Sequence, residues 1–277
     1  MLRHLSLVLV AAVVAVSAHA RHITLEETIT VQSINSAAIA PDGKMAAFTK
    51  VIPRQPYIDD DGTAYIELHA IRADGTIVPF ITGKESLSSI QLHDNGIYFL
   101  ARRGEVKHTS LYRIATDGGE AQLIFSHDSA MSSYALSSDG RYLAFRARSK
   151  TDDSKAKLAK KGFKAEVYEE ENVFTHAWLV DLHQESAKAV QLTDQREIHS
   201  VAFSPTQQQL LVRVAQTPLI DDNYMTSHYE LIDFSGNTVS KFDTIGVLGK
   251  AEFSPDGRYL AVIGAADYND PSAGRLY

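Results

Sequence analysis

Three consecutive carboxylates, Glu169, Glu170 and Glu171, are the side chains of this sequence best suited to recognition chemistry. Adjacent carboxylates make a strongly negative spot, and an ammonium group held between two of them gains charge-assisted hydrogen bonds. Such a site discriminates against ligands that lack the amine. Alternatively, the glutamates pair with the lysines between positions 150 and 164 in a solvated, partly helical loop, where ion pairs contribute little. The spacing leaves both interpretations open.

The sequence carries no signature of an activated nucleophile or of a bound metal. The pattern Gly-x-Ser-x-Gly, which places a reactive serine on a strand-to-helix turn, does not occur. Cysteine is absent, which excludes thiolate catalysis and cysteine-ligated metals. Residues 59–62, Asp-Asp-Asp-Gly, resemble a calcium loop but lack its glutamate ligand and flanking helices, so we expect a turn between strands. We therefore expect no metal, no cofactor and no catalytic residue in this chain.

A repeated sequence motif predicts the strands that must position the glutamates. Each copy is a short apolar strand, a turn rich in Asp, Asn, Pro or Gly, and a second apolar strand, which is typical of a β-hairpin. Asp-Gly and Asn-Gly steps supply the positive φ angles of a two-residue turn, whereas the fourth copy lacks the glycine and predicts a longer or differently shaped turn. The copies span Ser36 to Lys50, Ser88 to Arg102, Ser133 to Ala147, Ser200 to Val214 and Lys250 to Gly264.

Two further strands are expected after each of the first four hairpins. Segments that alternate at period two occupy residues 64–75, 108–119, 176–186 and 227–237, and shorter ones occupy 76–82, 120–126, 188–193 and 238–244. Four antiparallel strands in each of several successive units describe the blades of a β-propeller. The predicted fold is an all-β, incomplete propeller with four complete blades and the start of a fifth, in which 273–277 opens a third strand. We expect a fragment of a longer polypeptide, because an unfinished sheet leaves an open edge.

The first 20 residues are predicted to be a signal peptide and not part of the fold. A weakly basic start precedes an apolar run from Leu5 to Val16, and Ala18-His19-Ala20 is a small-x-small cleavage signal. The apolar run is shorter than the ~20 residues that cross a bilayer, so cleavage is favoured over a membrane anchor. We expect a periplasmic or secreted protein without a membrane association after cleavage. The net charge of −7, spread along the chain, indicates no nucleic-acid partner.

The "SSDGRYLAF" and "SPDGRYLAV" hairpins and the segment "GFKAEVYEEENVFTHAWLVDL" resemble the propeller of prolyl oligopeptidase family serine peptidases, in particular the acylaminoacyl-peptidase and dipeptidyl-aminopeptidase branch. The resemblance covers residues 25 to 277. "VYEEENVF" is similar to the dipeptidyl peptidase motif in which a glutamate pair binds the free amino terminus of the substrate. That role falls by motif match on Glu169 and Glu170 or, with the motif shifted by one residue, on Glu170 and Glu171. Here Asn172 interrupts the motif, and a full strand follows, as in the acylaminoacyl branch.

The resemblance implies a two-domain enzyme that acts on peptides from the amino terminus. Residues 21–277 would be the amino-terminal part of its propeller, and an α/β-hydrolase domain that is absent from this chain would supply the Ser, Asp and His of the triad. The propeller would gate and position the substrate, and this chain alone would be inactive. The hairpins also resemble periplasmic Tol-system propellers, so the alternative is a non-enzymatic propeller that binds proteins or peptides.

Overall fold

The computed structural model describes residues 21–149, 154–165, 172–269 and 272–277. The predicted signal peptide, residues 1–20, therefore lies outside the described residues. The first two sheets comprise β1 (Ser33–Ile39), β2 (Met45–Ile52), β3 (Tyr65–Arg72), β4 (Ile77–Ile81), β5 (Leu87–His93), β6 (Gly96–Ala101), β7 (Ser110–Ala115) and β8 (Gln122–Phe125). The third and fourth comprise β9 (Met131–Leu136), β10 (Tyr142–Arg148), β11 (Thr175–Asp181), β12 (Val190–Gln191), β13 (Glu197–Phe203), β14 (Gln209–Ala215), β15 (His228–Asp233) and β16 (Thr238–Phe242). The fifth comprises β17 (Leu248–Phe253), β18 (Leu260–Ala265) and β19 (Gly274–Leu276).

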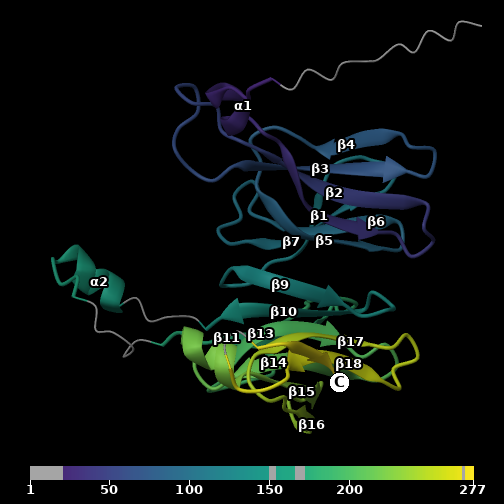
Figure 1. Ribbon diagram of the computed structural model, residues 1–277, viewed down its shortest axis with the longest axis vertical. Helices are drawn as coiled ribbons and strands as arrows, with labels where there is room; N and C mark the ends of the chain where they lie inside the picture. Colours follow the sequence, from purple (N-terminus) through teal and green to yellow (C-terminus); the bar gives the residue numbers. More distant parts are fainter. Residues whose placement is uncertain (1–20, 150–153, 166–171, 270–271) are drawn as a thin grey trace, which may run out of the picture.

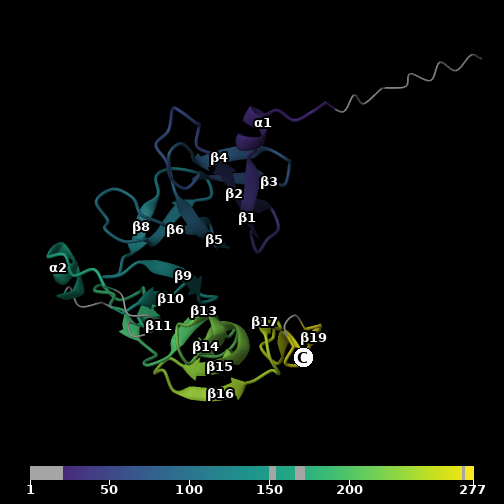
Figure 2. The same ribbon diagram turned by 60° about the vertical axis from the view of Figure 1, so that its left-hand side comes forward.

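The strands of each sheet pair in sequence order and antiparallel, as the blades of a β-propeller do. Four sheets have four strands and the fifth has three, and we number them blade one to blade five. Blades one to four succeed one another from top to bottom in Figure 1, where blade five overlaps blade four, and in Figure 2 the first strands of the blades surround a common centre. The arc is open between blades one and five (Figure 2). The predicted fold is confirmed, including the third strand of the fifth sheet.

Apolar clusters between neighbouring blades hold the arc together. In β10, Phe145 faces blade two, where it joins Leu100 and Leu111, while Ala144 faces blade four and joins Val212. Successive residues of a strand point to opposite faces, so a middle strand of a blade must be apolar on both. This requirement explains why the sequences of β6, β10 and β14 read as nearly continuous apolar runs.

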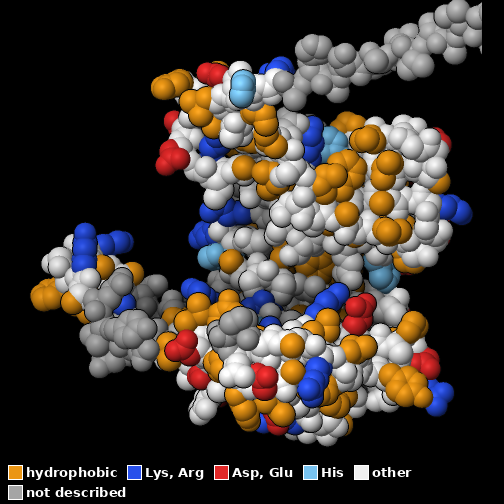
Figure 3. Space-filling model, in the orientation of Figure 1, with side chains coloured by type: hydrophobic (Ala, Val, Ile, Leu, Met, Phe, Trp, Pro, Cys, Tyr) orange, Lys and Arg blue, Asp and Glu red, His pale blue; other side chains and the backbone are white. Residues whose placement is uncertain are grey.

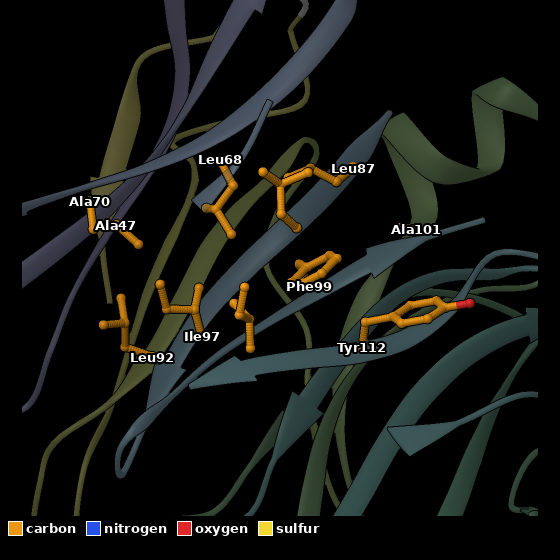
Figure 4. Close-up of a cluster of buried hydrophobic side chains, with 11 residues drawn as sticks. Ala47, Leu68, Ala70, Leu87, Leu92, Ile97, Phe99, Ala101 and Tyr112 are labelled. Carbon is orange, nitrogen blue, oxygen red and sulfur yellow. The ribbon is translucent and has the colours of Figure 1, made fainter. Parts of the chain in front are cut away.

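The interface between blades one and two illustrates the packing (Figure 4). Ala47, Leu68 and Ala70 from blade one meet Ile97 and Phe99 from blade two, and all five side chains are 0% exposed. Burying large apolar side chains contributes about 1.5–3 kcal/mol each. Because single blades would expose these faces, the neighbours stabilise one another.

Three of the hairpin turns are longer than the predicted two-residue turn. In the first, the N–H of Ala40 donates to the carbonyl of Met45 at 2.8 Å, so the loop is residues 41–44. Its third residue, Gly43, has a φ of 69°, and Gly140 and Gly257 in the corresponding turns have 67° and 68°. The glycines therefore provide the left-handed conformation that was expected of them, but within four-residue loops.

The second hairpin has the predicted two-residue turn, and the fourth has a differently shaped turn, as its missing glycine predicts. In the second hairpin, His93 pairs with Gly96 across a two-residue turn, and Asp94 has the positive φ, 48°. In the fourth hairpin, the N–H of Ser204 donates to the carbonyl of Gln209 at 2.9 Å. This loop is as long as its glycine-containing counterparts, so the missing glycine changes the backbone conformation and not the length.

The long connections between second and third strands lie at one end of the propeller, on the left in Figure 1. They carry the helix α2 (Ser154–Lys160) in blade three and the π-helix η1 (Asp222–Thr226) in blade four. The helix α1 (Leu25–Ile29) precedes blade one, and Thr24 caps its amino terminus. None of the described helices is long and apolar enough to cross a bilayer.

Gly236, in the turn between β15 and β16, lies against blade three, and we expect Gly236→Ala to be costly. Its φ is 86°, and an added Cβ would collide with the carbonyl oxygen of Leu192. The strain of an alanine in the left-handed backbone conformation and the steric overlap of its Cβ with Leu192 should together lower the free energy of unfolding by about 2–4 kcal/mol. Gly75→Ala is the matched control, because its φ is 84° with nothing within 4 Å of the added atom. It should cost about 1 kcal/mol in the same urea titration, and equal losses would contradict the proposed contact.

Candidate binding site at the junction of blades three and four

Glu169, Glu170 and Glu171 lie outside the described residues. The insertion that carries them leaves blade three after β10 and returns at β11. The N–H of Ser149 donates to the carbonyl of Phe174 at 3.1 Å, which joins the two ends of the insertion. The helix α2 on this insertion stands away from the blades in Figure 1. The expected partly helical character is confirmed by α2.

Glu197, on the first strand of blade four, anchors the point where the insertion returns. Its Oε2 accepts a hydrogen bond from the N–H of Thr175 at 2.6 Å, and its side chain is buried. The adjacent His176 is also buried, and burial lowers the pKa of its imidazole, although Asp194 and Glu197 act in the opposite direction. A buried carboxylate that accepts a backbone N–H fixes the end of the connection firmly.

Glu230, on β15, is the centre of a second polar cluster at the same end of blade four. It accepts hydrogen bonds from Arg196 at 2.6 Å, His228 at 2.8 Å and Thr238 at 2.8 Å. Burial acts to raise the pKa of Glu230, but the hydrogen bonds from His228 and Thr238 and the charge of Arg196 lower it overall. A cavity of about 340 Å³ opens beside this cluster, lined also by Lys241. The pocket is suited to binding a polar group.

A third group of polar side chains lies further inside, on β10, β13 and β14. Nε of Arg146 donates to the carbonyl of Ile198 at 2.7 Å. The guanidinium of Arg213 donates to the carbonyl of Asn223 at 2.9 Å and to Ser227 Oγ at 3.0 Å. His199 lies on β13, at a bulge in the pairing of β13 with β14. Burial, with the charges of Arg146 and Arg213, lowers the pKa of His199 to about 4.

The half-buried arginines were not identified as site residues from the sequence, although a signal is present. Arg146 and Arg213 interrupt "LAFRAR" and "LLVRVA", which are strands that must be apolar on both faces. A charge at such a position is rarely buried unless it is paired. The interruption of a two-sided apolar strand is therefore the pattern that points to these residues.

The unusual pKa of His199 predicts a pH-dependent stability. The folded protein binds a proton on His199 only near pH 4, whereas an unperturbed imidazole does so near pH 6.5. Unfolding therefore takes up a proton between these values, and the free energy of unfolding should fall as the pH falls through this window. We expect a loss of about 2 kcal/mol, allowing for partial solvent exposure.

Urea titrations at several pH values measure this loss. His199→Gln should flatten the dependence between about pH 4 and pH 6.5. His183→Gln removes an exposed histidine and should leave the slope unchanged. A slope that His199→Gln leaves unchanged would contradict the assignment, whereas a smaller residual slope is expected from His127 and His176, whose pKa values burial also lowers.

The junction of blades three and four gathers charged and polar side chains. Its charged groups come from several blades and connections, and in the part of the chain that the structure describes no group of three or more His, Asp or Glu residues could hold a metal ion. Trp178, on β11, has a structural role, because its Nε1 donates to the carbonyl of Ala147 at 3.2 Å and its ring stacks on Phe145. The Asp-rich segment 59–62 lies in the connection between β2 and β3, as expected.

Comparison of the sequence with family models and with curated proteins finds no match. The fold is similar to the acylaminoacyl peptidase of Pyrococcus horikoshii, with a TM-score of 0.64 and 12% identity over 91% of this chain and 39% of that chain. It is also similar to TolB from Acinetobacter baumannii, with a TM-score of 0.52 and 14% identity over 76% of this chain and 43% of that chain. A TolB-type protein from Agrobacterium tumefaciens has a TM-score of 0.52 and 18% identity over 83% of this chain and 74% of that chain.

This chain thus spans 43% of the Acinetobacter TolB and 39% of the acylaminoacyl peptidase. At these identities a likeness shows the fold alone. The fold is that of the β-propellers of TolB and of the acylaminoacyl peptidases.

Proposed function

We propose that this chain is the amino-terminal part of the propeller domain of an exported serine-type peptidase that hydrolyses peptides from their amino end. Residues 21–277 would follow a cleaved signal peptide of residues 1–20, and the protein would be periplasmic or secreted. The TM-score with the Pyrococcus horikoshii acylaminoacyl peptidase, 0.64, supports the peptidase comparison. The likeness to two TolB-type proteins supports export, which is a property of either candidate.

The observation that carries the proposal is the position of the glutamate-bearing insertion. It lies between β10 and β11, and its return is fixed by the hydrogen bond from Thr175 to Glu197. Residues 169–171 precede, by a few positions in the sequence, this hydrogen-bonded part of the junction. Binding a peptide by its terminal amine would require that the glutamates be held in a defined place, and the hydrogen bond at Thr175 would contribute to this.

In this proposal, a hydrolase domain outside these residues carries out the covalent chemistry. There a serine would attack the peptide carbonyl, a histidine would transfer the proton to the leaving amine, and an oxyanion hole would hold the developing charge. The propeller would restrict access and hold the peptide by its amino end through Glu169 and Glu170, or through Glu170 and Glu171. Its contribution is selectivity by positioning.

A non-enzymatic, Tol-type propeller that binds proteins or peptides is the second candidate. The coverage of the Agrobacterium tumefaciens TolB-type protein supports it, since this chain spans 74% of that structure. In that case the polar junction would bind a partner without catalysis.

One experiment separates the two candidates. The complete reading frame that contains this sequence should be expressed, labelled with a serine-reactive fluorophosphonate, and assayed on dipeptidyl and acylaminoacyl substrates. The peptidase proposal expects a labelled serine downstream of Tyr277 and hydrolysis by the complete protein, with neither for residues 21–277 alone. Absence of a labelled serine and of hydrolysis in the complete protein would overturn the proposal in favour of the second candidate.

A further inference from the structure

A small cavity lies between the hairpin turns of blades three and four, at the end of the propeller opposite the long connections. These turns are on the right in Figure 1, and hydrophobic and charged side chains lie next to one another on this end of the molecule in Figure 3. The volume of this cavity, which we call the turn cavity, is about 200 Å³. Pockets that enclose a whole drug-sized ligand measure about 300–1,000 Å³, so the turn cavity is suited to one chemical group of a ligand.

Three aromatic side chains line the turn cavity, namely Tyr142 at the start of β10, Phe203 at the end of β13 and Phe234 after β15. The ring centroid of Phe234 lies 5.0 Å from that of Tyr142 and 6.0 Å from that of Phe203. The ring plane of Phe234 is inclined by 62° and 80° to the other two planes. All three side chains are half-buried, so the rings keep surface that a ligand can contact. Steeply inclined rings around a cavity form an aromatic cage, the arrangement that recognises quaternary ammonium groups.

The turn cavity also carries a negative charge. Asp139 lines it, and no Lys, Arg or His is among the described residues that do so. Oδ1 of Asp139 accepts hydrogen bonds from Ser137 Oγ at 2.5 Å and from the N–H of Arg141 at 3.1 Å. These bonds, above all the one from Ser137, lower the pKa of Asp139, so its carboxylate is charged at neutral pH. The guanidinium of Arg141 is itself paired with Asp181 at 2.7 Å, which leaves a net charge that favours a cation.

Contacts between blades hold the walls of the turn cavity in place. Phe234 precedes a turn in which Gly236 lies against the carbonyl oxygen of Leu192 in blade three. The fourth hairpin turn, which lacks the repeated glycine, supplies another wall with residues 204–208. In that turn Thr206 lies against Gly257 of blade five. A site whose walls are fixed before the ligand arrives loses less conformational entropy on binding.

The cavity between the turns of blades one and two provides a contrast within the same chain. It measures about 700 Å³ and is lined by Ala40, Met45 and Ala73, without an aromatic side chain among the described residues around it. Its four aspartates are accompanied by the cations of Lys44 and Arg72. The three rings of the turn cavity are therefore not a requirement for packing neighbouring turns together.

We propose that the three aromatic rings of the turn cavity, together with Asp139, bind the quaternary ammonium group of a small soluble cation such as choline. The faces of the rings attract the methylated nitrogen, and the carboxylate supplies the counter-charge. The site lies at the opposite end of blades three and four from the polar junction. It depends neither on the peptidase function nor on amine recognition by Glu169 and Glu170.

The test titrates the full chain with choline chloride and, separately, with dimethylbutanol, the neutral isostere in which carbon replaces the nitrogen of choline. The ring-current shift of the ligand methyl protons in NMR spectra, recorded at constant ionic strength with sodium chloride, reports binding. We expect saturable binding of choline and about fivefold weaker binding of the isostere. Equal binding of the two would overturn the cation assignment, and absence of saturable choline binding would overturn the site.

Two tyrosines in the same sequence context locate the site. Tyr142→Leu removes one ring of the cage and should weaken choline binding about fivefold. Tyr259→Leu is the matched control, because Tyr259 follows the corresponding turn of blade five, is 67% exposed and does not line the turn cavity. It should leave choline binding unchanged. Equal affinities of wild type and Tyr142→Leu would overturn the proposal.

A second matched pair tests the carboxylate. Asp139→Asn should weaken choline binding about threefold and leave binding of the neutral isostere unchanged. Asp256→Asn perturbs an equivalent turn, since Oδ1 of Asp256 accepts hydrogen bonds from Ser254 Oγ at 2.6 Å and from the N–H of Arg258 at 3.1 Å. It should change neither affinity, and equal effects of the two variants would remove Asp139 from the site.

Vesicles of phosphatidylcholine present the same quaternary ammonium group on a lipid. We expect the protein to stay in the supernatant when these vesicles are sedimented, and co-sedimentation would overturn the assignment to a soluble cation. If Tyr142→Leu fails to fold, the comparison of choline with its isostere on the wild-type protein and the Asp139→Asn variant decides the outcome.

Discussion

Phe145→Ala is expected to lower the free energy of unfolding by about 3–5 kcal/mol. The Phe145 side chain is 0% exposed and lies in the cluster between blades two and three. Its ring lies 5.8 Å from that of Phe125 and 6.2 Å from that of Trp178, so truncation leaves a cavity lined by rigid aromatic groups. Rigid aromatic side chains cannot move in to fill the cavity, so the loss of free energy of unfolding should lie at the upper end of the range for this substitution.

Chemical denaturation of the purified protein, followed by tryptophan fluorescence, measures this effect. Phe163→Ala is the matched control, because it removes the same atoms from a side chain that is 69% exposed. It should change the free energy of unfolding by less than about 0.5 kcal/mol. Similar losses for the two variants would mean that the interface between blades two and three is not packed as described.

In the complete protein, replacing Glu169 and Glu170 together by glutamine is expected to lower kcat/KM for peptides with a free amino terminus by about 100-fold. Glutamine keeps the size of the side chains but removes the charges that would hold the ammonium group. Binding and transition-state positioning should both suffer, because the amine would fix the register of the peptide. This result presupposes the peptidase function.

The same peptides with an acetylated amino terminus provide the internal comparison, since their hydrolysis should change little. Glu185→Gln, at an exposed glutamate after β11, is the control variant and should keep wild-type kinetics for both substrates. If only the Glu170 and Glu171 pair proves sensitive, the shifted motif is right. Unchanged kinetics for both pairs would remove amine recognition from the proposal while leaving the peptidase assignment to its own experiment.

Local sequence patterns were sufficient to predict the blades. Each hairpin depends on a few consecutive residues, and the pairing of neighbours in sequence order needs no long-range information. Even the short β19, at Gly274–Leu276, was anticipated from its likeness to other third strands. The turns were predicted less well, because the Asp42-Gly43 step lies within a four-residue loop, whereas the Asn95-Gly96 step ends a two-residue turn.

The polar junction could not be predicted, because its contacts join residues that are far apart in the sequence. Arg146 and Ile198 are separated by 52 positions, and Arg196 and Glu230 by 34. No local pattern specifies such partners, which depend on how adjacent blades dock. The hydrogen bond from the N–H of Thr175 to Glu197 likewise depends on how the third and fourth blades pack together.

The separate apolar clusters between successive blades also determine how far the stabilising effect of a bound ligand extends through the protein. Each cluster couples a blade mainly to its immediate neighbours, so the molecule behaves as a linear chain of energetically linked modules. A ligand bound at blades three and four would slow amide hydrogen exchange most strongly in those two blades. The slowing of hydrogen exchange would decrease across each successive interface between blades, and it would be smallest in blade one.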